Sequence, residues 1–267
     1  MLKKIQNLMK VSRQYPYNGL MGKFPLADYM MLKLMPKLSF PGMSIVRFVK
    51  KYYKLNSDEE FRVRYYVSRI GFEELWSSRE RGDIKDIEHF YQEHDKDIWR
   101  QAWLSKYGYM YKKKILNVEH VVRGAGRKIK ILDYGCGSGA IAHYLSVKGH
   151  NVDVADIPSK TLDFVRAEMA DMLGNIITIN GFEDFGIDGY DLILTLDALE
   201  HTVAPLDITK RLMASLKSGG IFYVSFPKET DFSLAHTREA QEERPKVFEY
   251  LERSCKVIIP ESIYRKL

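Results

Sequence analysis

The chain has 267 residues, of which 45% are hydrophobic and 28% charged, with a formal net charge of +6. This composition supports a sizeable buried core and excludes a wholly disordered chain, and ordinary glycine and proline usage without a fixed repeat excludes collagen-like and solenoid architectures. Residues 1–57 carry eleven Lys and Arg against one acid, whereas the rest of the chain is mildly acidic. The basic segment predicts contact with something anionic, with a solvated basic surface as the alternative.

Cysteine content and apolar stretches indicate the compartment. Two cysteines, Cys136 and Cys255, are too few to staple a chain of this length, so a reducing cytoplasm is predicted. The basic N-terminus lacks the apolar segment of a signal peptide. The most apolar stretch, residues 26–49, is interrupted by charged residues and prolines, so we expect no membrane span.

The first part of the chain is expected to be helical. Residues 1–57 contain four prolines between short helical patterns and end in a basic amphipathic segment at residues 45–54. Aromatic side chains then recur at helical spacing up to about residue 120, as with Trp99 and Trp103, and we expect them to pack in a core. These features predict a helical, basic N-terminal extension or lid over residues 1–120.

Strand and helix patterns alternate beyond residue 124, which is typical of a doubly wound sheet of mostly parallel strands. The predicted fold class is therefore α/β, with the sheet domain at residues 121–267 following the helical N-terminal extension. Only residues 262–267 are left for a final strand, which is expected to be short or missing. The predicted strands cover residues 128–134, 151–155, 176–179, 190–196, 221–226 and 255–259, and the predicted helices cover residues 139–148, 159–172, 206–216 and 242–253.

A glycine-rich loop, Asp133 to Ala140, joins the first predicted strand to its helix. Its three glycines permit a tight turn and let a ligand lie against bare backbone, beside the free N–H groups of a helix start. Asp156 ends the next strand, where a carboxylate can accept hydrogen bonds from both ribose hydroxyls. A nucleoside-containing cofactor is predicted, although the spacing also fits a dinucleotide fingerprint and leaves a nicotinamide-dependent oxidoreductase open.

Two further runs decide between these cofactors: Tyr190 to His201 and Leu216 to Ile221. With them, and with Asp133 before the loop, the chain resembles the class I S-adenosylmethionine-dependent methyltransferases over about residues 125–226. The resemblance implies a Rossmann-like methyltransferase fold with S-adenosylmethionine as cofactor. The cofactor-binding residues that it implies are Asp133, Gly135, Cys136, Gly137 and Gly139 at the methionine end, Asp156 at the ribose, Phe182 and Glu183 at the adenine, and Asp197 at the end of the fourth strand.

Titratable side chains, among them Glu200 and His201, follow the fourth predicted strand, where ligands of open α/β sheets bind. Because a sulfonium methyl group is already activated, the protein has chiefly to position the acceptor and manage any proton that it loses. His201, with Glu200, is the predicted catalytic pair. Two alternatives stay open: a structural role in pinning the loop, and a magnesium site that includes Asp197, although no metal is predicted. His236 either faces the acceptor or is simply exposed.

The predicted function is a methyltransferase that uses S-adenosylmethionine, with O-methylation of a small molecule or of a sugar- or lipid-linked metabolite. The basic segment of residues 1–57 favours peripheral contact with an anionic membrane surface. One alternative is a nucleic-acid methyltransferase, which the modest total charge and the lack of an apparent RNA-binding module disfavour. The other is a non-catalytic scaffold that binds the cofactor and docks a membrane or partner.

Overall fold

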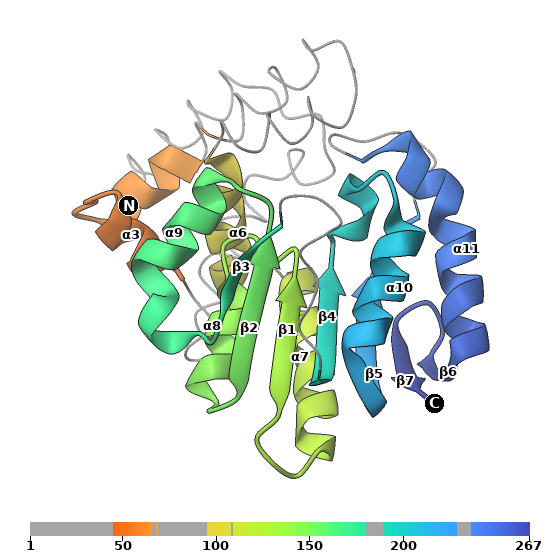
Figure 1. The fold of residues 1–267 in the computed structure, drawn as a ribbon. Helices are drawn as coiled ribbons and strands as arrows, with labels where there is room; N and C mark the ends of the chain where they lie inside the picture. Colours follow the sequence, from red (N-terminus) through yellow and green to blue (C-terminus); the bar gives the residue numbers. More distant parts are fainter. Residues whose placement is uncertain (1–44, 66–67, 69–94, 108, 180–188, 229–235) are drawn as a thin grey trace.

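The central sheet is defined in a computed structural model that describes residues 45–65, 68, 95–107, 109–179, 189–228 and 236–267 (Figure 1). Within these residues, seven strands are ordered β3-β2-β1-β4-β5-β7-β6. β1 to β5 run parallel, whereas β7 is antiparallel to β5 and β6 is antiparallel to β7. The predicted doubly wound, mostly parallel α/β fold is confirmed. The strands are β1 (Lys130–Tyr134), β2 (Asn151–Asp156), β3 (Ile176–Thr178), β4 (Tyr190–Leu196), β5 (Leu216–Ser225), β6 (Cys255–Ile259) and β7 (Ile263–Lys266).

Helices cover both faces of this sheet (Figure 1). Successive side chains of a strand point to opposite faces, so Ile131 and Leu132 of β1 belong to two separate apolar clusters. Full burial of an aromatic side chain such as Phe164 or Phe222 contributes roughly 1.5–3 kcal/mol. The face of Ile131 packs against α3 (Val46–Tyr52), α6 (Lys96–Tyr107), α7 (Tyr109–Gly124), α8 (Ala140–Val147) and α9 (Lys160–Met169), and the face of Leu132 against α10 (Pro205–Ser215) and α11 (Arg238–Ser254).

Capping side chains set the starts of two helices. Ser159 accepts a hydrogen bond from the N–H of Leu162 at 3.1 Å and begins α9, as predicted. Thr237 accepts from the N–H of Ala240 at 3.1 Å and begins α11 four residues before the predicted start at residue 242. The earlier start matters because it fixes the segment just before α11 against the end of β4.

The C-terminal edge contains a short final strand. β7 has four residues and lies between β5 and β6, so the last strand is short, as expected, and present. Tyr264 at its centre is fully buried. Lys266 donates hydrogen bonds to the carbonyls of Met213 and Leu216 at 2.7 and 2.6 Å. These contacts anchor the final strand to the end of α10 and the start of β5.

The described part of the N-terminal region is helical and packs on the body. Trp99 is buried, and Trp103 stacks on Tyr65 with ring centroids 4.4 Å apart, which confirms that these aromatics pack as core. α7 runs through residues 120 and 121, so the predicted domain boundary falls inside a helix and stays a prediction. Among the described residues, no helix is both long and apolar enough to cross a membrane.

The amphipathic segment at residues 45–54 uses its apolar side within the protein. Val46 and Val49 of α3 are buried. Lys50 pairs with Asp58 at 2.9 Å, and Lys51 pairs with Glu168 at 2.8 Å. The apolar face of α3 is therefore not available to a membrane surface, and predicted membrane contact depends on residues 1–44, which lie outside the described residues.

Candidate functional site

The glycine-rich loop makes a tight turn at the carboxyl end of β1. Gly135, Gly137 and Gly139 have φ angles of +69°, +51° and +70°, in the left-handed region that favours glycine. The N–H groups of Gly135 and Cys136 both donate to the carbonyl of Ala155 in β2, at 2.8 and 3.2 Å. A Cβ at Gly135 would lie 2.3 Å from the Cβ of Ala198, so the loop also closely approaches the segment after β4.

Asp156 holds the loop from the end of β2. One carboxylate oxygen accepts from the N–H of Gly137 at 2.7 Å, and the other accepts from the N–H of Ile157 at 2.8 Å. Burial raises the pKa of Asp156 to about 6, and these two backbone donors partly offset that rise. Hydrogen bonds from the backbone therefore already fix the orientation of the Asp156 carboxylate, which is predicted to bind the ribose.

Asp133 lies beneath the loop and is nearly inaccessible, with 3% of its surface exposed. Burial and the neighbouring charge of Asp156 raise its pKa to about 7. Burial likewise raises the pKa of the Cys136 thiol well above its usual value, which keeps that side chain protonated and unsuited to act as a nucleophile. Two buried acids with raised pKa values form a site that gains from positively charged or hydroxyl-bearing ligand groups.

Helix α6 of the N-terminal region contacts this loop, and the sequence motifs did not predict this contact. The Oε1 atom of Gln101 accepts from the N–H of Ser138 at 2.6 Å and from its hydroxyl at 2.8 Å. A Cβ at Gly137 would lie 2.1 Å from the amide nitrogen of Gln101. Asp97, one turn earlier, adds negative charge beside Asp156, and burial raises the pKa of Asp97. Nothing in the sequence of α6 distinguishes these two residues from other polar side chains of an amphipathic helix.

Asp197, at the end of β4, contacts side chains of β5 and α7. Its φ of +57° is unusual for a residue with a side chain. Its carboxylate accepts from the hydroxyl of Ser225 at 2.7 Å and forms an ion pair with Lys114 of α7. The predicted role of Asp197 in cofactor binding stays a prediction, and part of its hydrogen-bonding capacity is already used by these contacts.

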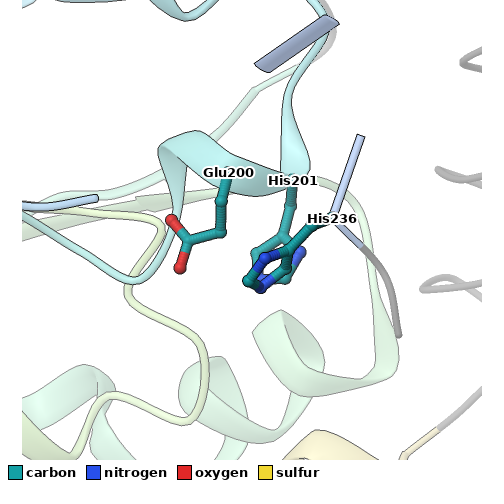
Figure 2. A group of neighbouring side chains, drawn as sticks. All are labelled: Glu200, His201 and His236. Atoms are coloured by element: carbon teal, nitrogen blue, oxygen red, sulfur yellow. The ribbon is translucent and has the colours of Figure 1, made fainter. Parts of the chain in front are cut away.

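Glu200 and His201 lie in the short 3-10 helix η3 (Leu199–His201), and Glu200 is buried. The segment before α11 brings His236 beside them, with the two histidine ring centroids 4.9 Å apart. The N–H of Thr237 donates to the carbonyl of Glu200 at 2.9 Å. In Figure 2, the side chains of Glu200 and His201 extend from η3, and the side chain of His236 reaches His201 from a separate segment. His236 is half-buried beside His201 and so is not simply exposed, and its contact with the acceptor stays a prediction.

Phe182 and Glu183, predicted to approach the adenine, lie outside the described residues. Their assignment stays a prediction.

A family model for a methyltransferase domain matches residues 107–263, which is more than half of the chain. The chain belongs to this methyltransferase-domain family. Membership, together with the glycine loop, confirms the resemblance seen in the sequence and gives S-adenosylmethionine as the cofactor. The residues present fit this cofactor, because the glycine loop lies between two carboxylates, Asp133 and Asp156, whose chemistry suits its ammonium and ribose groups.

Curated relatives match only part of the chain. The ubiquinone biosynthesis O-methyltransferase of Actinobacillus pleuropneumoniae is 31% identical over 105 residues, covering 36% of this chain and 44% of the relative. The protein of the same name from Rickettsia typhi is 30% identical over 102 residues, covering 37% and 41%. The chain thus spans less than half the length of these relatives. Among solved structures, magnesium protoporphyrin IX methyltransferase from Synechocystis shows a TM-score of 0.49 at 16% identity, covering 70% of this chain and 98% of that one.

Proposed function

We propose that this protein transfers the methyl group of S-adenosylmethionine to a hydroxyl oxygen of a small-molecule acceptor. The observation that carries the proposal is the glycine loop, which Asp156 anchors through the N–H of Gly137 beside the buried Asp133. The matched relatives are named O-methyltransferases, which supports oxygen as the acceptor atom. The run after β4 reads Asp197-Ala198-Leu199-Glu200, without the Asn/Asp-Pro-Pro-aromatic pattern that marks nitrogen methylation by resemblance.

The chain's own residues have three tasks in this reaction. Asp133 and the loop glycines hold the methionine end of the cofactor, and Asp156 accepts hydrogen bonds from its ribose. When bound, the cofactor supplies a methyl group that its sulfonium already activates. His201, with Glu200, then acts on the proton of the acceptor hydroxyl, because both lie at the end of β4 where the crevice of such a sheet opens.

A finer choice of acceptor follows from charge. Residues 1–57 carry a strong positive excess, which favours an acceptor that is linked to a sugar or lipid and presented at an anionic surface. This choice depends on residues 1–44, since the lysines of α3 pair within the protein.

Thermal unfolding with S-adenosylhomocysteine or NADH tests the cofactor site. A ligand at 100 times its dissociation constant adds about 2.7 kcal/mol, so we expect the midpoint to rise by roughly 5 °C with S-adenosylhomocysteine and not with NADH. Asp156→Ala should reduce this rise. Asp171→Ala, which removes an exposed acid in the 3-10 helix η2 (Ala170–Met172), is the matched control and should keep it. A rise with NADH alone would contradict the proposal.

Methyl transfer is measured next, with labelled S-adenosylmethionine and a panel of hydroxyl acceptors of the small-molecule, sugar-linked and lipid-linked classes. We expect His201→Ala to lower the rate by about 100-fold or more while S-adenosylhomocysteine still binds. Binding without transfer to any acceptor would favour the scaffold alternative instead.

A further inference from the structure

A potential metal site forms where η3 meets the segment before α11. Glu200, His201 and His236 each offer one ligand atom, and these three atoms lie within 4.8 Å of one another (Figure 2). We propose that the three side chains bind one divalent transition-metal ion next to the acceptor. The proposal rests on the function proposed above and deepens it, because it assigns the chemistry that acts on the acceptor hydroxyl.

Backbone contacts hold these ligands together across 35 residues of sequence. Thr237 is buried and donates through its N–H to the carbonyl of Glu200 at 2.9 Å. Its hydroxyl also donates to the carbonyl of Thr202 at 2.5 Å. The residues that flank the ligands are therefore tied to one another, which keeps the two segments that carry the three side chains together.

The spacing suits a common ion after small side-chain movements. Ligand atoms bound at about 2.0–2.2 Å from an ion in a tetrahedral arrangement are separated by roughly 3.3–3.6 Å. The three ligand atoms lie within 4.8 Å of one another, so each would move by about 1 Å to reach this separation. Three protein ligands leave a further position open, as in catalytic metal sites, and an acceptor oxygen can take it.

The donor set selects the class of ion. Two imidazole nitrogens and one carboxylate oxygen suit Zn²⁺, Co²⁺ or Fe²⁺, whereas Mg²⁺ prefers an octahedral set of oxygens. This differs from the magnesium alternative, which depended on Asp197. The carboxylate of Asp197 is engaged by Lys114 and Ser225, and His236 supplies the third ligand in its place.

The ion would act on the acceptor oxygen directly. With Glu200 ionised and both histidines neutral, the bound ion keeps a net charge of about +1, which lowers the pKa of a hydroxyl in the open position. The acceptor O–H proton then passes to water, and the oxyanion forms the new C–O bond. As that bond forms, the C–S bond of the cofactor breaks and its electron pair stays on sulfur. The effect of His201 on the acceptor proton, proposed above, is thus exerted through the ion that it binds.

Metal binding by stripped protein tests the site. After removal of metal with a chelator, calorimetric titration of the full chain with Zn²⁺, Co²⁺ or Mg²⁺ should show one ion per chain, with Zn²⁺ and Co²⁺ bound more tightly than Mg²⁺. His236→Ala should weaken Co²⁺ binding by about 100-fold or more and remove the visible absorption of the bound ion, because losing a ligand costs at least as much as losing an outer partner.

Two controls keep the result interpretable. His120→Ala removes an exposed histidine of α7 and should leave Co²⁺ binding unchanged. Glu200→Gln replaces the buried ligand, and retained binding of S-adenosylhomocysteine shows that each variant folds. Stripped protein that binds no ion, a preference for Mg²⁺, or Co²⁺ binding unaffected by His236→Ala would overturn the proposal.

Rates separate this proposal from the broader one. If stripped protein transfers methyl groups as fast as metal-loaded protein, the metal assignment fails while the methyltransferase function stands. If the protein binds Co²⁺ through His236 yet does not bind S-adenosylhomocysteine, the proposed function fails while the metal site stands.

Discussion

The two ends of the candidate site are assembled in different ways. At the β1 and β2 end, the loop and Asp133 come from one continuous run, and Asp156 follows at the end of the neighbouring strand. At the β4 end, Glu200 and His201 are joined by His236 from a segment beyond β5. The first end depends on backbone conformation and buried charge, whereas the second depends on a tertiary contact made by Thr237. Substitutions at the first end should therefore alter folding and cofactor binding together.

The largest effect is expected for Gly135→Ala. The added Cβ would meet the Cβ of Ala198 at 2.3 Å, and the φ of +69° is strained for alanine. Strain and overpacking together should lower the free energy of unfolding by about 3 kcal/mol and abolish S-adenosylhomocysteine binding. Urea unfolding and calorimetry measure both quantities.

The matched control for that substitution is Gly126→Ala. Gly126 has a similar φ of +64°, but nothing lies within 4 Å of its added Cβ. It should lose only about 1 kcal/mol and keep cofactor binding. Equal losses in the two variants would show that the contact between the loop and Ala198 does not matter.

The next effect concerns the pH dependence of stability. The pKa of Asp133 rises from 3.8 to about 7 on folding, so its protonated form stabilises the fold below pH 4 and that stability is lost as pH rises through 7. Without ligand, the free energy of unfolding of the wild type should fall between pH 5 and pH 8 by roughly 2.5 kcal/mol relative to Asp133→Asn, which cannot ionise.

The comparison with the variant is needed because other groups titrate as well. Burial lowers the pKa of His150, which stabilises the fold as pH rises and opposes the effect of Asp133. Asp191, whose pKa is about 2, changes stability only below this range. Parallel pH curves for wild type and Asp133→Asn would show that Asp133 is ionised throughout.

The contrast between the two ends also explains which residues of the site could be predicted from the sequence. The parallel sheet, Asp133, the glycines and Asp156 were predictable because periodicity and a contiguous loop encode them. The partners of Asp197 were not, because its contacts with Lys114 and Ser225 come from residues 83 and 28 positions away. The sequence places His236 after the fifth strand, but the position of its side chain beside His201 depends on the way in which Thr237 caps α11. Local pattern fixes the elements, and packing between distant elements decides which side chains meet.

The smallest effect is expected for Gln101→Ala, which tests how α6 supports the first end. The variant removes the acceptor used by the N–H and hydroxyl of Ser138, at 2.6 and 2.8 Å. Losing about 1 kcal/mol of loop organisation should weaken S-adenosylhomocysteine binding roughly fivefold, as measured by calorimetry. Arg100→Lys, at the exposed neighbouring position of α6, keeps the positive charge beside Asp97 and should leave binding unchanged. Tighter binding by Gln101→Ala would mean that the glutamine competes with the cofactor for the loop, and α6 would then block the site it borders.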